Sequence, residues 1–124
     1  MYSNNYNKYM EQSVNSLTPG EQITLLFRHA AANIAKAIKC IEEGKICDAH
    51  NAIVKAQNIY AYLSDSLDMH YEISGSLFTL YEYIQDLLVE ANLKKDASAL
   101  QHALLMTREF CETWEKAEIV TRTL

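Results

Sequence analysis

The chain has 124 residues, of which 49% are hydrophobic and 22% are charged, a balance typical of one folded domain. Its formal net charge of −5 argues against a nucleic-acid-binding protein, because such a protein needs a basic face to displace counterions from phosphates. The sequence has no apolar run near the roughly 20 residues that span a membrane, and its start has no apolar signal-peptide core. We therefore expect a cytoplasmic protein without membrane insertion.

Residues 1–17 are rich in Asn, Ser and Tyr and poor in aliphatic residues. Tyr2, Tyr6 and Tyr9 nevertheless recur at helical spacing, which is typical of a short amphipathic segment that lies on a folded body. We predict that this N-terminal segment is a detachable lid. A frayed terminus with incidental tyrosines is the alternative interpretation.

The first long helix is expected over residues 19–43. Thr18 can accept hydrogen bonds from the free amides of the first turn, Pro19 suits the first helical position, and Glu21 completes a capping box. Apolar residues then recur in steps of three and four, which indicates one buried face. Gly44 follows where a left-handed C-terminal cap is needed.

Three further helices are expected over residues 46–67, 72–92 and 97–120. The second has the most regular pattern, with apolar residues at alternating steps of three and four from Ile46 to Leu67. Asp96 can cap the fourth helix. Short connections make neighbouring helices antiparallel, so the sequence predicts an all-α, up-down four-helix bundle preceded by the N-terminal segment over residues 1–17.

The histidines and cysteines do not form a catalytic or metal-binding pattern. None of the four histidines has Glu three residues before it, so the Glu-x-x-His pairs of di-iron bundles are missing. Three cysteines without a C-x-x-C motif indicate buried thiols, not a zinc site or a disulfide framework. With only three glycines, a phosphate-binding loop is hard to build. We expect no enzyme, no cofactor and no metal.

The second, third and fourth helices have apolar faces wider than the arc of about 100° that a bundle buries. The additional apolar residues are Ala52 and Ile59, then Phe78, Tyr81 and Leu88, and finally Leu105 and Met106. An apolar face that the bundle leaves uncovered indicates an interaction site. The residues alone leave three occupants open: a partner polypeptide, a second copy of the chain, and the N-terminal segment.

Several short motifs follow one another in an order that covers nearly the whole chain. They are Tyr6-Asn7-Lys8-Tyr9, Leu17-Thr18-Pro19-Gly20-Glu21, Ile53-Val54-Lys55-Ala56-Gln57-Asn58-Ile59, Leu63-Ser64-Asp65-Ser66-Leu67-Asp68-Met69 and Trp114-Glu115-Lys116-Ala117. This ordered set resembles the FliS family of bacterial flagellin export chaperones. Two features depart from the family pattern. Phe27-Arg28-His29-Ala30 replaces its Tyr-Asp-Gly-Ala, and the turn after Asp68-Met69 lacks its Gly-Gly.

The resemblance implies a cytosolic chaperone that binds the C-terminal segment of flagellin, prevents premature polymerisation and presents flagellin to components of the export apparatus. We expect a monomer or weak dimer; the alternative function is a homo-oligomeric scaffold without a flagellin client. On this hypothesis Tyr6 and Tyr9 act as a lid over a groove. The candidate groove residues, most of which could instead be ordinary core residues, are Ile53, Gln57, Tyr60, Tyr81, Ile84 and Leu88.

Overall fold

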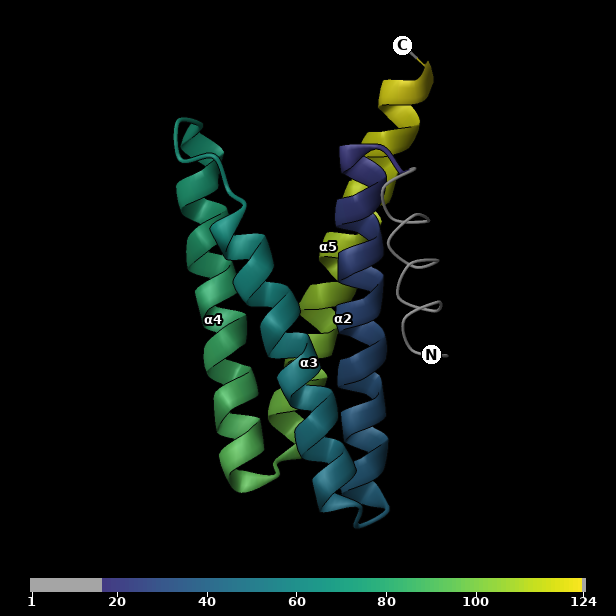
Figure 1. Ribbon diagram of the computed structural model, residues 1–124, viewed down its shortest axis with the longest axis vertical. Helices are drawn as coiled ribbons and strands as arrows, with labels where there is room; N and C mark the ends of the chain where they lie inside the picture. The colour runs from purple at the N-terminus through teal and green to yellow at the C-terminus, as the bar shows by residue number, and fades with distance from the viewer. Residues whose placement is uncertain (1–16, 124) are drawn as a thin grey trace, which may run out of the picture.

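This computed structural model describes residues 17–123, and the side chains of residues 17–117. The described chain forms four helices, which are α2 (Pro19–Glu42), α3 (Ile46–Asp65), α4 (Glu72–Lys94) and α5 (Ala97–Thr123). Successive helices run antiparallel (Figure 1); α2 packs along α3 and α5, and α4 contacts the same two helices less extensively. The expected all-α, up-down four-helix bundle is confirmed. All four helices begin where the sequence places them.

Side-chain caps fix the beginnings of α2 and α5. Thr18 Oγ1 accepts a hydrogen bond from the backbone N–H of Glu21 at 3.2 Å and donates one to its carboxylate at 3.1 Å. Pro19 occupies the first turn, where the missing N–H has no cost. Asp96 Oδ1 accepts a hydrogen bond from the backbone N–H of Ser98 at 2.9 Å, just before α5. Both caps are those that the sequence predicts.

The ends of α2 and α4 use left-handed backbone. Gly44 has a φ of +75°, and the following N–H of Lys45 donates back to the carbonyl of Cys40 at 2.7 Å, which stops α2. Lys95 adopts a φ of +50° after α4, a conformation that disfavours side chains with a Cβ. Its ammonium compensates, because it donates to the carbonyl and the side-chain oxygen of Asn92 at 2.5 and 2.6 Å.

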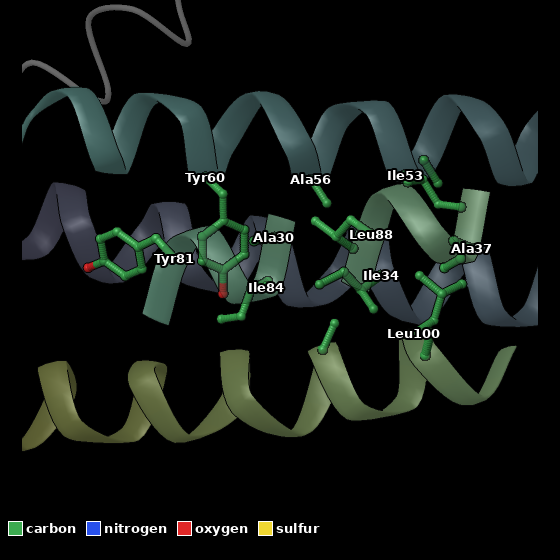
Figure 2. Packing of buried hydrophobic residues seen from close by; sticks show 14 of the residues in the cluster. Ala30, Ile34, Ala37, Ile53, Ala56, Tyr60, Tyr81, Ile84, Leu88 and Leu100 are labelled. Carbon is green, nitrogen blue, oxygen red and sulfur yellow. The ribbon is translucent and has the colours of Figure 1, made fainter. Parts of the chain in front are cut away.

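At one end of the bundle the core consists mainly of small and aliphatic residues. This closed end contains the α2–α3 and α4–α5 turns and lies at the bottom of Figure 1. Small side chains let helix axes approach closely, so the four helices close tightly here. The buried residues of the closed end are Ile34, Ala37, Cys40, Ala49, Ala52, Ile53, Ala56, Leu88, Ala91, Ala99, Leu100 and Ala103. Figure 2 labels Ile34, Ala37, Ile53, Ala56, Leu88 and Leu100 of this set.

Four aromatic rings lie farther along the bundle, one from each helix. They are Phe27 of α2, Tyr60 of α3, Tyr81 of α4 and Phe110 of α5, and the ring centroids of five of their six pairs are 5.2–6.2 Å apart. We call them the aromatic cluster. Tilted, edge-on and offset contacts at these distances are favourable.

Beyond the aromatic cluster the helices separate into two arms. In Figure 1, α3 and α4 lean away from α2 and α5, so the bundle has the outline of a V. The rings are much larger than the alanines of the closed end, and helix separation follows the size of the side chains between the axes. The bundle is therefore closed at one end and open at the other.

Candidate partner-binding groove

The open end contains two adjoining apolar hollows. The larger, of about 320 Å³, lies between the first half of α4 and the second half of α5. The smaller, of about 190 Å³, lies among all four helices. Both are lined by Ile73, Leu77 and Trp114, so they form one continuous depression, which we call the groove. The larger hollow adds Leu80, Met106 and Phe110, and the smaller adds Ile23, Leu63, Leu67, Tyr71 and Tyr81.

The walls of the groove follow from helical spacing. Ile73, Leu77 and Leu80 lie one turn apart on α4, so their side chains stack along one face. On α5, Phe110 and Trp114 are likewise one turn apart and half-buried. The side chain of Ile73 is 66% exposed and that of Leu80 is 40% exposed. Apolar surface of this kind, contiguous and uncovered, is typical of an interaction site.

The polar groups of the groove are acidic or neutral. Asp68 lines the smaller hollow and Glu109 the larger, and no Lys, Arg or His is among the described residues that line either. Hydrogen bonds from the backbone N–H and the side chain of His70, at 3.0 and 2.8 Å, lower the pKa of Asp68. Ser74 Oγ donates to the carbonyl of Asp68 at 2.5 Å. These bonds hold the short turn between α3 and α4 without the glycine pair of the family.

Four of the six predicted groove residues lie in the core. Ile53, Tyr60, Ile84 and Leu88 have no exposed surface, because the bundle closes over the face that carries them. In this structure they do not line the groove, and their burial fits the alternative that they are ordinary core residues. A contact between a partner and these four side chains stays a prediction that requires the helices to separate.

The other predicted site residues have different positions. Tyr81 lines the smaller hollow although its side chain is almost fully buried. Gln57 is half-buried, and its main-chain carbonyl accepts a hydrogen bond from Gln85 Nε2 at 2.8 Å, which ties α3 to α4. The predicted lid residues Tyr6 and Tyr9 lie outside the described residues.

Sequence reasoning missed most of the residues that line the groove. Ile73, Leu77 and Leu80 continue the apolar period of α4, and Phe110 and Trp114 continue that of α5, so they resemble core residues. A signal was nevertheless present: large apolar residues concentrate toward one end of the bundle and alanines toward the other. Such a gradient indicates where the helices cannot close.

Arg28 and His29, which stand where the family has Asp-Gly, lie on α2 and do not line the groove. Arg28 Nε and Nη2 donate to Glu115 Oε1 of α5 at 2.9 and 2.7 Å, which lowers the pKa of Glu115. His29 lines a separate hollow of about 190 Å³ between α2 and α3, with Leu25 and Tyr62. The ion pair is exposed to solvent, so its role is a surface link between α2 and α5.

Neither a metal site nor a membrane span is found in the part of the chain that the structure describes. Among the described side chains of residues 17–117, no group of three or more His, Cys, Asp and Glu residues could hold a metal ion. None of the described helices combines the length and the apolar character needed to cross a bilayer.

Comparisons with known proteins agree on one family. The family model described as flagellar protein FliS matches residues 2–121. The chain is 32% identical over 114 residues to the flagellar secretion chaperone FliS of Bacillus subtilis, covering 92% of this chain and 86% of that protein. It is 31% identical over 110 residues to FliS of Salmonella typhimurium, covering 86% and 82%. A crystal structure described as a flagellar chaperone from bacteria has the same fold, with a TM-score of 0.75 at 15% identity over 94% of this chain and 97% of that one.

Proposed function

Because the chain belongs to the FliS family of flagellar secretion chaperones, we propose that its groove binds the C-terminal segment of flagellin in the bacterial cytosol. A chaperone bound to this segment keeps flagellin from polymerising before export and supports flagellum assembly. The observation that carries the proposal is the apolar groove at the open end of the bundle.

The size and spacing of the groove suit a peptide. The larger hollow, at about 320 Å³, is at the lower end of the range of roughly 300–1,000 Å³ that is typical of small-molecule sites, a size that suits single anchor side chains of a peptide. An amphipathic helix presents anchors three and four residues apart, and Ile73, Leu77 and Leu80 have the same spacing on the wall. Side chains of such a helix can therefore lie between those of α4 and α5, as ridges do in grooves.

The physical chemistry of the groove favours a complex that can be released. A segment that orders on binding loses conformational entropy, which offsets part of the favourable burial of apolar surface. The described lining residues provide no cation that could form a strong ion pair with the client. Affinity then comes mainly from apolar contacts, and components of the export apparatus can take over the client.

The proposal includes a lid over residues 1–17, with Tyr6 and Tyr9 covering part of the groove when no client is bound. Deletion of residues 1–14 should leave the bundle folded, because the Thr18 cap and the described core follow the deleted part. The truncated protein should bind the flagellin segment at least as tightly, since no lid competes. Loss of the helical circular dichroism signal, or weaker binding, would contradict the lid.

Isothermal titration calorimetry with a peptide of the C-terminal segment of the same organism's flagellin tests the main proposal. The variant Ile73→Glu places a charge in the groove and should weaken binding by about tenfold or more, because an apolar anchor then meets a charge. The matched control is Leu93→Glu, since Leu93 is on the same helix, is 83% exposed and does not line the groove. The control should bind as the unchanged protein does.

The same experiment separates the chaperone from a homo-oligomeric scaffold. The exposed apolar residues of the groove could also be covered by a second copy of the chain. Light scattering should give a monomer or weak dimer that forms a complex with the peptide. A stable dimer that does not bind the peptide, and that Ile73→Glu dissociates, would replace the chaperone proposal with the scaffold.

A further inference from the structure

The smaller hollow is lined by a tyrosine whose hydroxyl has no hydrogen-bond partner among the described residues. Tyr81 is 1% exposed, yet it lines this hollow. The hydroxyl oxygen of Tyr81 lies at the end of the ring that points away from Tyr60 (Figure 2). In contrast, the hydroxyl of Tyr60 is paired with Thr107 Oγ1 at 2.5 Å inside the core. The hydroxyl of Tyr60 therefore has its hydrogen-bond partner within the bundle, whereas that of Tyr81 faces the groove.

The remaining hydroxyls of the smaller hollow already have partners or reach solvent. Ser66 Oγ and Ser74 Oγ both donate to main-chain carbonyls of nearby residues, at 3.0 and 2.5 Å. Tyr71 is largely exposed, so its hydroxyl can bind water. Among the hydroxyls of the described residues that line the smaller hollow, that of Tyr81 is thus the one on an almost fully buried side chain that has no partner in the chain.

Filling the hollow changes the surroundings of this hydroxyl. Burial raises the pKa of Tyr81 to about 12, so the group keeps its proton at neutral pH and can donate it. A client that fills the hollow expels water from it. If the client has no acceptor there, the buried donor stays unpaired, a loss that corresponds to a factor of about five to ten in affinity.

We propose that Tyr81 is a specificity-determining residue whose hydroxyl donates a hydrogen bond to a neutral oxygen of the bound segment. At the position of the segment that faces Tyr81, this hydrogen bond favours an amide, a hydroxyl or a free main-chain carbonyl over a purely apolar group. The acceptor is neutral, because Asp68 lines the same hollow and its described lining has no cation to balance a client carboxylate. This inference rests on the proposed binding of flagellin.

The test compares Tyr81→Phe with Tyr60→Phe by calorimetry against the flagellin C-terminal peptide. Tyr81→Phe removes only the unpaired hydroxyl and should weaken binding about five- to tenfold. Tyr60→Phe removes a hydroxyl whose partner is inside the core, so affinity should stay unchanged. Circular dichroism and thermal melting establish that both variants are folded. Unchanged or tighter binding by Tyr81→Phe would overturn the inference, whereas failure of the unaltered protein to bind would overturn the proposed function itself.

Changes in the peptide test the same bond without altering the chaperone. Each Asn, Gln, Ser and Thr of the peptide is replaced in turn by an apolar residue of similar size. A replacement that weakens binding to the unaltered protein about five- to tenfold, but leaves binding to Tyr81→Phe unchanged, identifies a side-chain acceptor. If no replacement does so while Tyr81→Phe still binds more weakly, the acceptor is a main-chain carbonyl.

Discussion

At the closed end of the bundle, alanines and aliphatic residues lie between the helices, whereas the aromatic cluster lies between them where the open end begins. Ala37, Ala52 and Ala103 have no or almost no exposed surface, which shows how completely small residues are enclosed. At the open end Ile73 and Leu80 remain exposed although they are just as apolar. Burial therefore depends less on the chemistry of a residue than on how close its neighbouring helix can come.

This difference teaches how a bundle can stabilise itself and bind a partner with the same helices. A uniform core would bury every apolar residue and leave no site. Large rings at one level keep the arms apart, so the apolar residues beyond them remain available. We therefore expect stability to depend mainly on the closed end, and the proposed binding to depend on the open end.

The largest expected effect separates stability from binding. Ile53→Ala at the closed end should lower the free energy of unfolding by about 2–5 kcal/mol, because it leaves a cavity among fully buried neighbours. Ile73→Ala at the open end should change it by no more than about 0.5 kcal/mol, since that side chain is largely exposed. Urea denaturation measures both. Similar losses of unfolding free energy for the two variants would contradict the view that stability depends mainly on the closed end.

The next effect tests whether small residues keep the closed end closed. Ala56→Leu adds bulk at a position without exposed surface and should destabilise the protein by about 1–3 kcal/mol through overpacking. Ala61→Leu is the matched control, because Ala61 is on the same helix but exposed. Thermal unfolding should show a lower midpoint for Ala56→Leu alone. Equal midpoints for the two variants would mean that the closed end has spare room.

A smaller effect is expected within the aromatic cluster. Thr107 Oγ1 donates to the carbonyl of Ala103 at 2.8 Å, so Tyr60 is the donor in its hydrogen bond to Thr107. Tyr60→Phe should lower the free energy of unfolding by about 0.5–1.5 kcal/mol, the usual net value of such a bond. Denaturation at neutral pH measures this loss, and no change would mean that the bond contributes nothing to stability.

The same tyrosine has a pH signature. Burial raises the pKa of Tyr60 above its ordinary value of 10.0, so the unfolded state loses this proton first. The stability that the neutral hydroxyl supports is fully present below pH 10 and is lost as the pH rises through the higher folded-state pKa. Between pH 9 and 11, about one unit either side of the ordinary tyrosine pKa, the free energy of unfolding of Tyr60→Phe should therefore fall less steeply with pH than that of the unchanged protein. An unchanged slope would contradict the assignment.

The smallest effect concerns the exposed link between α2 and α5. Glu115→Gln removes its ion pair with Arg28 and should reduce stability only slightly, and less so at high salt, because solvent screens both groups. The pKa of Glu115 is lowered mainly by its hydrogen bond with Arg28. The stability that the ionised Glu115 contributes is therefore present above the ordinary glutamate pKa. It is lost as the pH falls through the lowered value. A large loss, or one independent of salt, would show that this link supports the open end.

Much of the fold could be predicted from the sequence because its signals are local. The cap at Thr18, the left-handed position of Gly44 and the cap at Asp96 depend on neighbouring residues only. The apolar period of each helix then identifies one buried face, and the short connections determine the antiparallel order. The motifs also pointed to the FliS family, which the comparisons confirm.

The groove could be predicted only in part, because it depends on distances between helices. The apolar period assigns Ile73 and Ile84 to the same face of α4, yet Ile73 is largely exposed and Ile84 has no exposed surface. The aromatic cluster lies between these two residues along α4, and it determines which of the two a neighbouring helix can cover. Tyr81 was a predicted groove residue and does line the smaller hollow, whereas Leu88 lies too near the closed end.

The aromatic cluster takes one ring from each helix, and this has a consequence for how such a chaperone could evolve. The width of the groove is a shared property of these four ring positions, and two of them, Phe27 and Tyr60, do not line the groove. A change such as Phe27→Leu would bring the arms together and alter which clients fit, while every residue on the groove walls stayed the same. Client preference can thus drift among related chaperones through substitutions that a comparison of their surfaces would overlook.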